Sequence, residues 1–203
     1  MWKLAPLLGT SAAEWAWDDQ FSRGVWEYLD DRDASVAGIV AQQLDRVSTD
    51  VERTVVDLGC GVGNLAFELP RESFSRYIGV DVSRVAISDA ARRAERAGGD
   101  GFEFVCEDLR QWRGVSGASV IVIEEALYYL GTRAQCRLLD TCEQSLADDG
   151  ALILLIHDPE KHPGTTRLLE RRYGRECVRD ADGTRMCMVV PSVHEYRVAD
   201  ETD

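Results

Sequence analysis

Three aspartates are the residues of this sequence best placed to do ligand chemistry. Asp57, Asp81 and Asp108 each lie at or near the end of a run of β-branched and apolar residues, which predicts a buried strand. Ligands of open α/β sheets bind at the carboxyl ends of the strands, so we expect these carboxylates to face a common site. A single aspartate there is more often a helix cap or a turn former, but three at such intervals favour a binding site.

Three glycines directly after Asp57 indicate which kind of ligand would bind. Gly59, Gly61 and Gly63 permit a turn that most side chains would block, and a helix is predicted to start at Asn64. The spacing differs from the dinucleotide fingerprint G-x-G-x-x-G, and Asp57 would repel a pyrophosphate. The same carboxylate suits a ligand that carries positive charge.

The pattern D-x-G-x-G-x-G from Asp57 to Gly63 resembles the first motif of class I S-adenosylmethionine-dependent methyltransferases. Their cofactor has a sulfonium and an ammonium but no phosphate. The resemblance covers about residues 54–190 and implies S-adenosyl-L-methionine as cofactor and S-adenosyl-L-homocysteine as product. Asp81 is then expected to accept hydrogen bonds from the ribose hydroxyls, and Asp108 to face the adenine amino group. The other residues expected to contact the cofactor are Trp17, Trp26, Asp57, Gly59, Gly61, Gly63, Asn64, Val82, Leu109 and Glu124.

The stretch 124–130, after the fourth predicted strand, is the most informative about the substrate. It lacks the Asn/Asp-Pro-Pro-Tyr motif of DNA and protein-amide methyltransferases. It is similar instead to the nodulation N-methyltransferase group, which acts on a chitooligosaccharide amine and has Glu-Val-Leu-Tyr-Tyr-Leu at the positions of residues 125–130.

Four residues near this stretch and at the end of the fifth predicted strand are catalytic candidates: Glu125, Tyr128, Tyr129 and His157. His157 is placed to act as a general base, or it simply caps the strand end. Core packing remains the alternative for one of the two tyrosines. The spacing of His157, Asp158 and His162 is unlike a known metal site, so we expect no metal.

Five predicted strands separated by helices precede two alternating runs joined across an Asp-Gly turn, which indicates a hairpin. We therefore predict an α/β fold: a Rossmann-like, doubly wound sheet of five parallel strands plus a C-terminal antiparallel hairpin, with helices on both faces. Residues 1–203 are expected to form a single methyltransferase domain with its cofactor-binding core at 54–190. The predicted strands are 54–58, 76–81, 102–109, 118–123 and 151–157.

Residues 1–50 are predicted to form a helical lid or cap segment. Residues 1–13 would be a loose lead-in, and Asp18 or Asp19 would cap the helix that follows. Trp17 and Trp26 either close over the cofactor, where cation–π contact with a sulfonium is possible, or pack on the domain.

The composition limits the kinds of partner that this protein is expected to bind. The chain has 36 acidic and 23 basic residues and a formal net charge of −13, which disfavours a nucleic-acid substrate and an anionic membrane surface. Its six cysteines form no C-x-x-C pair, and no signal peptide is expected, so we predict a cytoplasmic protein with reduced thiols. The expected partner is a small-molecule substrate, and the expected assembly is a monomer or homodimer.

The leading hypothesis is an S-adenosylmethionine-dependent methyltransferase acting on a nitrogen or oxygen of a small polar metabolite, with a sugar or amino-sugar intermediate as the best guess. Three alternatives stay open. One is a non-catalytic S-adenosylmethionine-binding module, and another is an O-methyltransferase of another secondary-metabolite or carboxylate acceptor. The third is an NAD-dependent oxidoreductase, which the glycine spacing and Asp57 disfavour.

Overall fold

The computed structural model describes residues 10–25, 35–47, 52–174, 177–179 and 185–192. Its centre is a seven-stranded sheet in the order β3-β2-β1-β4-β5-β7-β6. Strands β1 to β5 are parallel, and β7 lies antiparallel between β5 and β6. This confirms the predicted five parallel strands with an antiparallel C-terminal pair. The strands are β1 (Thr54–Leu58), β2 (Arg76–Asp81), β3 (Phe102–Cys106), β4 (Ala118–Glu124), β5 (Leu146–His157), β6 (Cys177–Arg179) and β7 (Arg185–Pro191).

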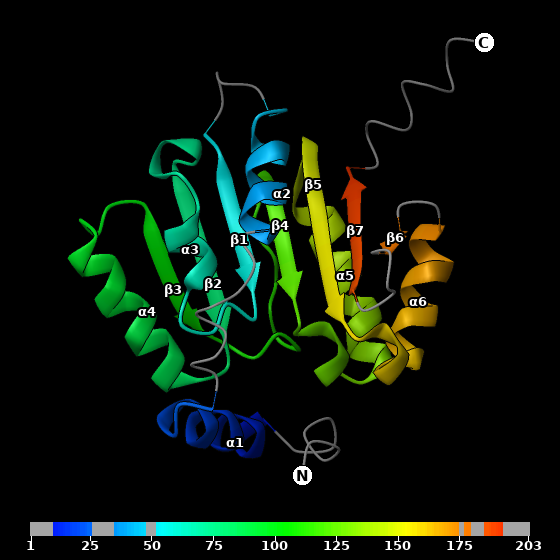
Figure 1. Cartoon of the computed structure of the whole chain (residues 1–203), viewed down its shortest axis with the longest axis horizontal. Coiled ribbons are helices and arrows are strands. Elements are labelled where there is room, and N and C mark those ends of the chain that lie inside the picture. The colour runs from blue at the N-terminus through cyan, green and yellow to red at the C-terminus, as the bar shows by residue number, and fades with distance from the viewer. Residues whose placement is uncertain (1–9, 26–34, 48–51, 175–176, 180–184, 193–203) are drawn as a thin grey trace.

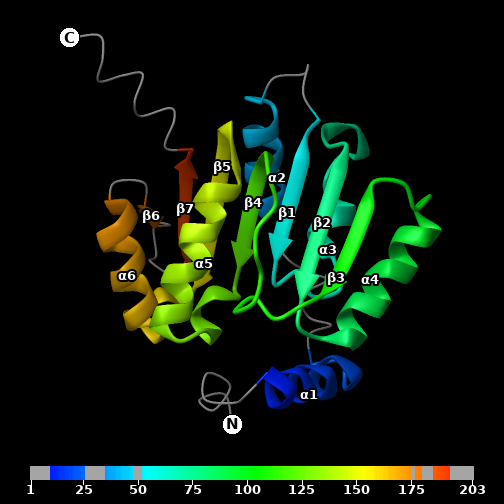
Figure 2. The same cartoon turned by 180° about the vertical axis from the view of Figure 1, so that it is seen from behind.

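Helices cover both faces of the sheet, as the alternation of strands and helices predicts (Figures 1 and 2). One face carries α2 and α3, and the other carries α5 and α6, while α4 packs on β2 and β3. The α-helices are α1 (Thr10–Ser22), α2 (Ser35–Leu44), α3 (Asn64–Glu68), α4 (Arg84–Arg96), α5 (Thr132–Ser145) and α6 (Pro163–Tyr173). Three short 3-10 helices are η3 (Arg71–Ser73), η4 (Leu127–Tyr129) and η5 (Pro159–Lys161).

The central strands are buried on both sides, which explains their nearly continuous apolar sequence. Every residue of β1 is buried, as are the first six of the seven residues of β4. Alternate residues point into two separate apolar layers: Val56 and Ile121 face α5 and α6, whereas Val55 and Val120 face α2 and α3. The two layers hold the strand ends in fixed positions, and so they position any group that those ends carry.

The outer strand β3 is built differently. Only five residues long, it alternates partly buried Phe102 and Phe104 with exposed Glu103. Glu103 pairs with Arg76 of the neighbouring strand at 2.6 Å.

The N-terminal helix differs from the prediction. α1 begins at Thr10, within the expected loose lead-in, because Ala12, Ala13 and Ala16 favour helix upstream of the aspartates. Asp18 and Asp19 therefore lie inside the helix and do not cap it. Trp26, one of the residues predicted to contact the cofactor, lies outside the described residues.

Other boundaries also differ from the prediction. β3 ends at Cys106, three residues before the predicted end. β5 begins at Leu146, five residues earlier than predicted, with a register irregularity between Ala118 and Val120 of its partner β4. α6 begins with Pro163, which loses no hydrogen bond at the first helical position. Over the described part of the chain, no helix combines the length and apolar character needed to cross a membrane.

The layer between the sheet and α5 yields a stability prediction. Leu139 is fully buried there, so Leu139→Ala should lower the free energy of unfolding by about 2–5 kcal/mol through the cavity it leaves. The exposed Gln144 on the same helix provides the control, since Gln144→Ala should change it by less than about 0.5 kcal/mol. Urea unfolding of the two variants measures both, and equal effects would contradict this packing.

Candidate active site

The carboxyl ends of the five parallel strands point toward α1, which lies across that edge of the sheet (Figure 1). The chain leaves β1 toward β2 on one side and reaches β4 on the other, so the strand order reverses between β1 and β4. In open α/β sheets, ligands bind in the crevice at such a reversal. The predicted site residues lie at this edge.

The glycine turn after β1 brings the backbone close to its neighbours. Gly63 has φ +76°, a left-handed conformation, and a Cβ there would lie 2.9 Å from the ring of Phe104. Gly59 has φ +88°, and a Cβ there would overlap the Cβ of Ala126. Larger residues are therefore excluded at both positions, and the turn presents bare backbone to the site.

Asp57 is buried beneath this turn, with only 4% of its surface exposed. The Tyr77 hydroxyl donates a hydrogen bond to its carboxyl group at 2.5 Å. Burial raises the pKa of Asp57 to about 7; the Tyr77 hydrogen bond opposes this, and repulsion from Glu124 and Asp81 adds to it. A bound cation would offset this repulsion and favour the ionised form of Asp57, so the site suits a ligand with positive charge.

Asp81 ties the glycine turn to the start of α4. Its two carboxyl oxygens accept the backbone N–H of Gly61 at 3.0 Å and that of Ser83 at 2.9 Å. Burial raises its pKa, and these backbone hydrogen bonds oppose the rise. Each oxygen keeps a further lone pair, so contact with ribose hydroxyls is compatible with this geometry.

Asp108 is also buried, but a neighbouring side chain engages it. The guanidinium of Arg110 donates from Nε at 2.9 Å and from Nη2 at 2.6 Å to one carboxyl oxygen, and the Arg110 backbone N–H donates to the other at 2.9 Å. Sequence reasoning missed Arg110. A cation two residues after an acid was the available signal, but it does not distinguish this closed pair from solvent-exposed charges.

Glu125 lies just after β4 in a left-handed conformation, with φ +56°. Its Oε2 accepts the Tyr128 hydroxyl at 2.8 Å, and its Oε1 accepts the backbone N–H of His157. The carboxylate thus joins the ends of β4 and β5. The side chain of His157 itself is exposed.

Four rings form a row beside Glu125. Trp17 of α1 meets Tyr129 edge-on at 4.8 Å, Tyr129 contacts Tyr128 at 4.6 Å, and Tyr128 stacks on His162 at 3.7 Å between centroids. Burial lowers the pKa of His162, which favours the neutral imidazole. Sequence reasoning did not place His162 beside Tyr128. Proline at the following residue signals a helix start but says nothing about stacking on a ring.

Comparisons with known proteins agree with this geometry. Residues 55–150 match the family model described as a methyltransferase domain. This part of the chain is therefore a methyltransferase domain.

Curated relatives carry the same domain. The trans-aconitate 2-methyltransferase of Azoarcus sp. (strain BH72) is 28% identical over 184 residues, which is 89% of this chain and 65% of the relative. A putative methyltransferase of Geobacillus sp. (strain WCH70) is 28% identical over 60% of this chain and 49% of its own length. This chain therefore spans less than two thirds of either relative.

Solved structures share the fold of the methyltransferase domain. The N-methyltransferase NodS of Bradyrhizobium japonicum WM9, in complex with S-adenosyl-L-homocysteine, superposes with TM-score 0.61 at 20% identity, covering 83% of this chain and 91% of NodS. Magnesium protoporphyrin IX methyltransferase of Synechocystis PCC 6803, with bound S-adenosylmethionine, gives TM-score 0.58 at 19% identity, covering 78% and 79%.

The methyltransferase domain brings Asp57, Asp81 and Glu124 together, as the sequence predicts, and adds Tyr77 as an unpredicted partner. Among the described residues, no group of three histidine, cysteine, aspartate or glutamate side chains is arranged to hold a metal ion.

Asp57 gives the domain a pH-dependent stability. Its pKa rises from 3.8 to about 7 on folding, so the folded state binds the extra proton between those values. The free energy of unfolding should therefore fall as pH rises from about 4 to about 7, by at most about 1.4 kcal/mol per pH unit from this group. Urea unfolding at pH 5 and pH 7 measures the fall.

The neutral variant Asp57→Asn is the reference, since it removes this titration and should flatten the profile. Identical slopes for the two proteins would contradict the assigned protonation of Asp57.

Proposed function

We propose that this chain is an S-adenosylmethionine-dependent methyltransferase that transfers a methyl group to a nitrogen or oxygen of a small polar metabolite. The observation that carries the proposal is the buried carboxyl group of Asp57, with Asp81 and Glu124 nearby, beneath a bare glycine turn in a methyltransferase domain. A sulfonium and an ammonium would offset the repulsion among these carboxyl groups, whereas a pyrophosphate would increase it.

In this proposal the cofactor lies along the strand ends. Its methionine part meets Asp57, Gly59, Gly61, Gly63 and Glu124, and Asp81 with Val82 binds the ribose. The adenine lies beside Asp108 and the backbone N–H of Leu109, and Arg110 must share Asp108 with its amino group. The proposed cofactor set is completed by Asn64 at the start of α3 and by Trp17 and Trp26.

The acceptor side consists of Glu125, Tyr128, Tyr129 and His157. Methyl transfer is an in-line displacement: the nucleophile bonds the methyl carbon, the carbon–sulfur bond breaks, and the homocysteine thioether leaves. Glu125 is our proposed general base because the Tyr128 hydroxyl, which donates to its carboxylate at 2.8 Å, would hold it beside an acceptor bound at the ends of β4 and β5. Burial raises the pKa of Tyr128, which keeps its hydroxyl protonated as a donor.

We propose an amine or hydroxyl of a sugar or amino-sugar intermediate as the first acceptor candidate, on the similarity of residues 125–130 to the nodulation N-methyltransferase group. A carboxylate acceptor is the second candidate, favoured by the similarity to trans-aconitate 2-methyltransferase. The two differ chemically, since an ionised carboxylate has no proton to lose and gains nothing from a base. A cytoplasmic location and a monomeric or homodimeric state remain predictions from the composition.

The first test is cofactor binding by titration calorimetry. S-adenosylmethionine and S-adenosylhomocysteine should bind, and NAD should not. Asp57→Ala and Asp81→Ala should each weaken binding by about 1–3 kcal/mol through lost charged hydrogen bonds, while the exposed, remote Asp45→Ala should not. Binding of NAD alone would overturn the proposal.

The second test concerns Glu125. Glu125→Gln should lower kcat on an amine or hydroxyl acceptor by about 10²–10⁴-fold without changing cofactor affinity. The exposed Glu160→Gln in the nearby η5 serves as the control. Activity on a carboxylate that survives Glu125→Gln would favour the second candidate, and full activity of Glu125→Gln on amines would exclude Glu125 as the base.

A further inference from the structure

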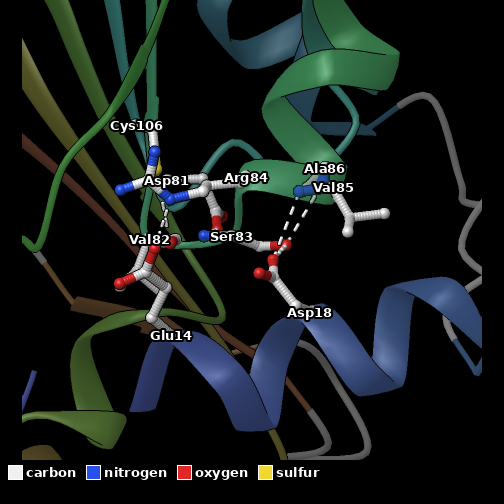
Figure 3. Close-up of polar contacts among 9 residues, drawn as sticks. All are labelled: Glu14, Asp18, Asp81, Val82, Ser83, Arg84, Val85, Ala86 and Cys106. Carbon is white, nitrogen blue, oxygen red and sulfur yellow. Dashed lines mark hydrogen bonds and ion pairs between the residues drawn. The ribbon is translucent and has the colours of Figure 1, made fainter. Parts of the chain in front are cut away.

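α1 is joined to α4 by a carboxylate that caps α4 from outside its own sequence. Asp18 Oδ1 accepts the Ser83 hydroxyl at 2.6 Å and the backbone N–H of Val85 at 3.2 Å, as Figure 3 shows. Sixty-five residues separate Asp18 from Ser83 in the sequence.

This contact completes the N-terminal cap of α4. The Ser83 hydroxyl accepts the Ala86 N–H at 3.2 Å, so Ser83 satisfies one free amide of the first turn and Asp18 satisfies a second. A carboxylate at a helix N-terminus also interacts favourably with the helix dipole. The hydrogen bonds are charge-assisted, which makes them stronger than those between neutral groups.

The same turn leads directly to the cofactor site. The Ser83 N–H donates to Asp81, whose other oxygen accepts the Gly61 N–H. Asp18, Ser83, Asp81 and Gly61 thus form one continuous chain of hydrogen bonds from α1 to the glycine turn. A displacement of α1 would remove the first member of that chain.

Other side chains of α1 lie over the site without a charged contact. A Cβ at Gly61 would lie 3.4 Å from the Phe21 ring, and Trp17 contacts Tyr129. The second polar contact to α4, Glu14 with Arg84 at 2.5 Å, is an ion pair whose arginine is largely exposed, and such pairs stabilise little. Asp18 is therefore the polar contact best suited to hold α1 in place.

We propose that Asp18 is a positioning residue that holds α1 over the cofactor and so slows cofactor release. The proposal rests on the cofactor site proposed above. Asp18 acts through Ser83 and does not touch the cofactor itself. α1 then works as a lid over the proposed cofactor site, and its closure depends on a cap shared between two helices.

The test measures how fast a fluorescently labelled S-adenosylmethionine analogue leaves the protein. Release is followed by stopped-flow fluorescence, with unlabelled S-adenosylhomocysteine in excess as the chase. Asp18→Ala should accelerate release about tenfold, which corresponds to about 1.4 kcal/mol. The release rate of Asp18→Asn should lie between those of wild type and Asp18→Ala. Its amide oxygen can still accept the Ser83 hydroxyl, but it carries no charge. Asp19→Ala is the matched control: Asp19 is the next residue of α1, and it pairs with Arg23 at 3.0 Å.

A second measurement separates docking of α1 from general stability. Amide hydrogen exchange should increase over residues 10–22 and the first turn of α4 in Asp18→Ala, with the unfolding midpoint within about 2 °C of wild type. Asp19→Ala should leave the exchange of α4 unchanged.

The outcomes distinguish this inference from the proposed function. Wild-type protein that binds neither cofactor nor product refutes the cofactor site, and with it the effect on release; the exchange measurement then decides whether Asp18 docks α1. Wild-type binding with equal release rates for Asp18→Ala and Asp19→Ala overturns the role of Asp18 alone. If amide exchange is unchanged in Asp18→Ala, the role of Asp18 in docking α1 is overturned, whether or not the protein binds the cofactor.

Discussion

The cost of burying carboxyl groups at the carboxyl end of the parallel sheet governs how this region is built. Asp57, Asp81 and Asp108 are each less than a tenth exposed, so none is stabilised by bulk water. Each is stabilised differently: Asp57 by a tyrosine hydroxyl and a raised pKa, Asp81 by backbone N–H groups, and Asp108 by a guanidinium. These stabilising contacts come from Tyr77, the glycine turn, the start of α4 and Arg110.

The proposed acceptor side contains two residues with strained backbone. Glu125 and Asp158 are the two non-glycine residues with left-handed backbone in the described part of the chain, and they follow the adjacent strands β4 and β5. Such a conformation costs of the order of 1 kcal/mol or more and persists only where surrounding contacts fix it. At Glu125 those contacts are the Tyr128 hydroxyl and the His157 N–H, which direct the carboxylate between the two strand ends.

Much of the fold could be predicted because its signals are local. Buried parallel strands give continuous apolar runs, and Asp57, Asp81 and Glu124 could be assigned to one edge from strand direction alone. What could not be predicted depends on contacts between distant residues. Asp18 resembles a cap of its own helix, and only the folded chain reveals that it caps α4. The stacking of His162 on Tyr128 and the hydrogen bond from Tyr77 to Asp57 likewise join separate elements, so periodicity carries no sign of them.

The outer strand β3 constrains how copies of this chain could associate. An exposed sheet edge is a template for pairing with another strand, and natural proteins limit this with short edge strands and charged side chains. β3 has both features: five residues, and Glu103 at an exposed position, paired with Arg76. Extending the sheet across two molecules through β3 is thus disfavoured, so a dimer of this chain would be expected to join through another surface.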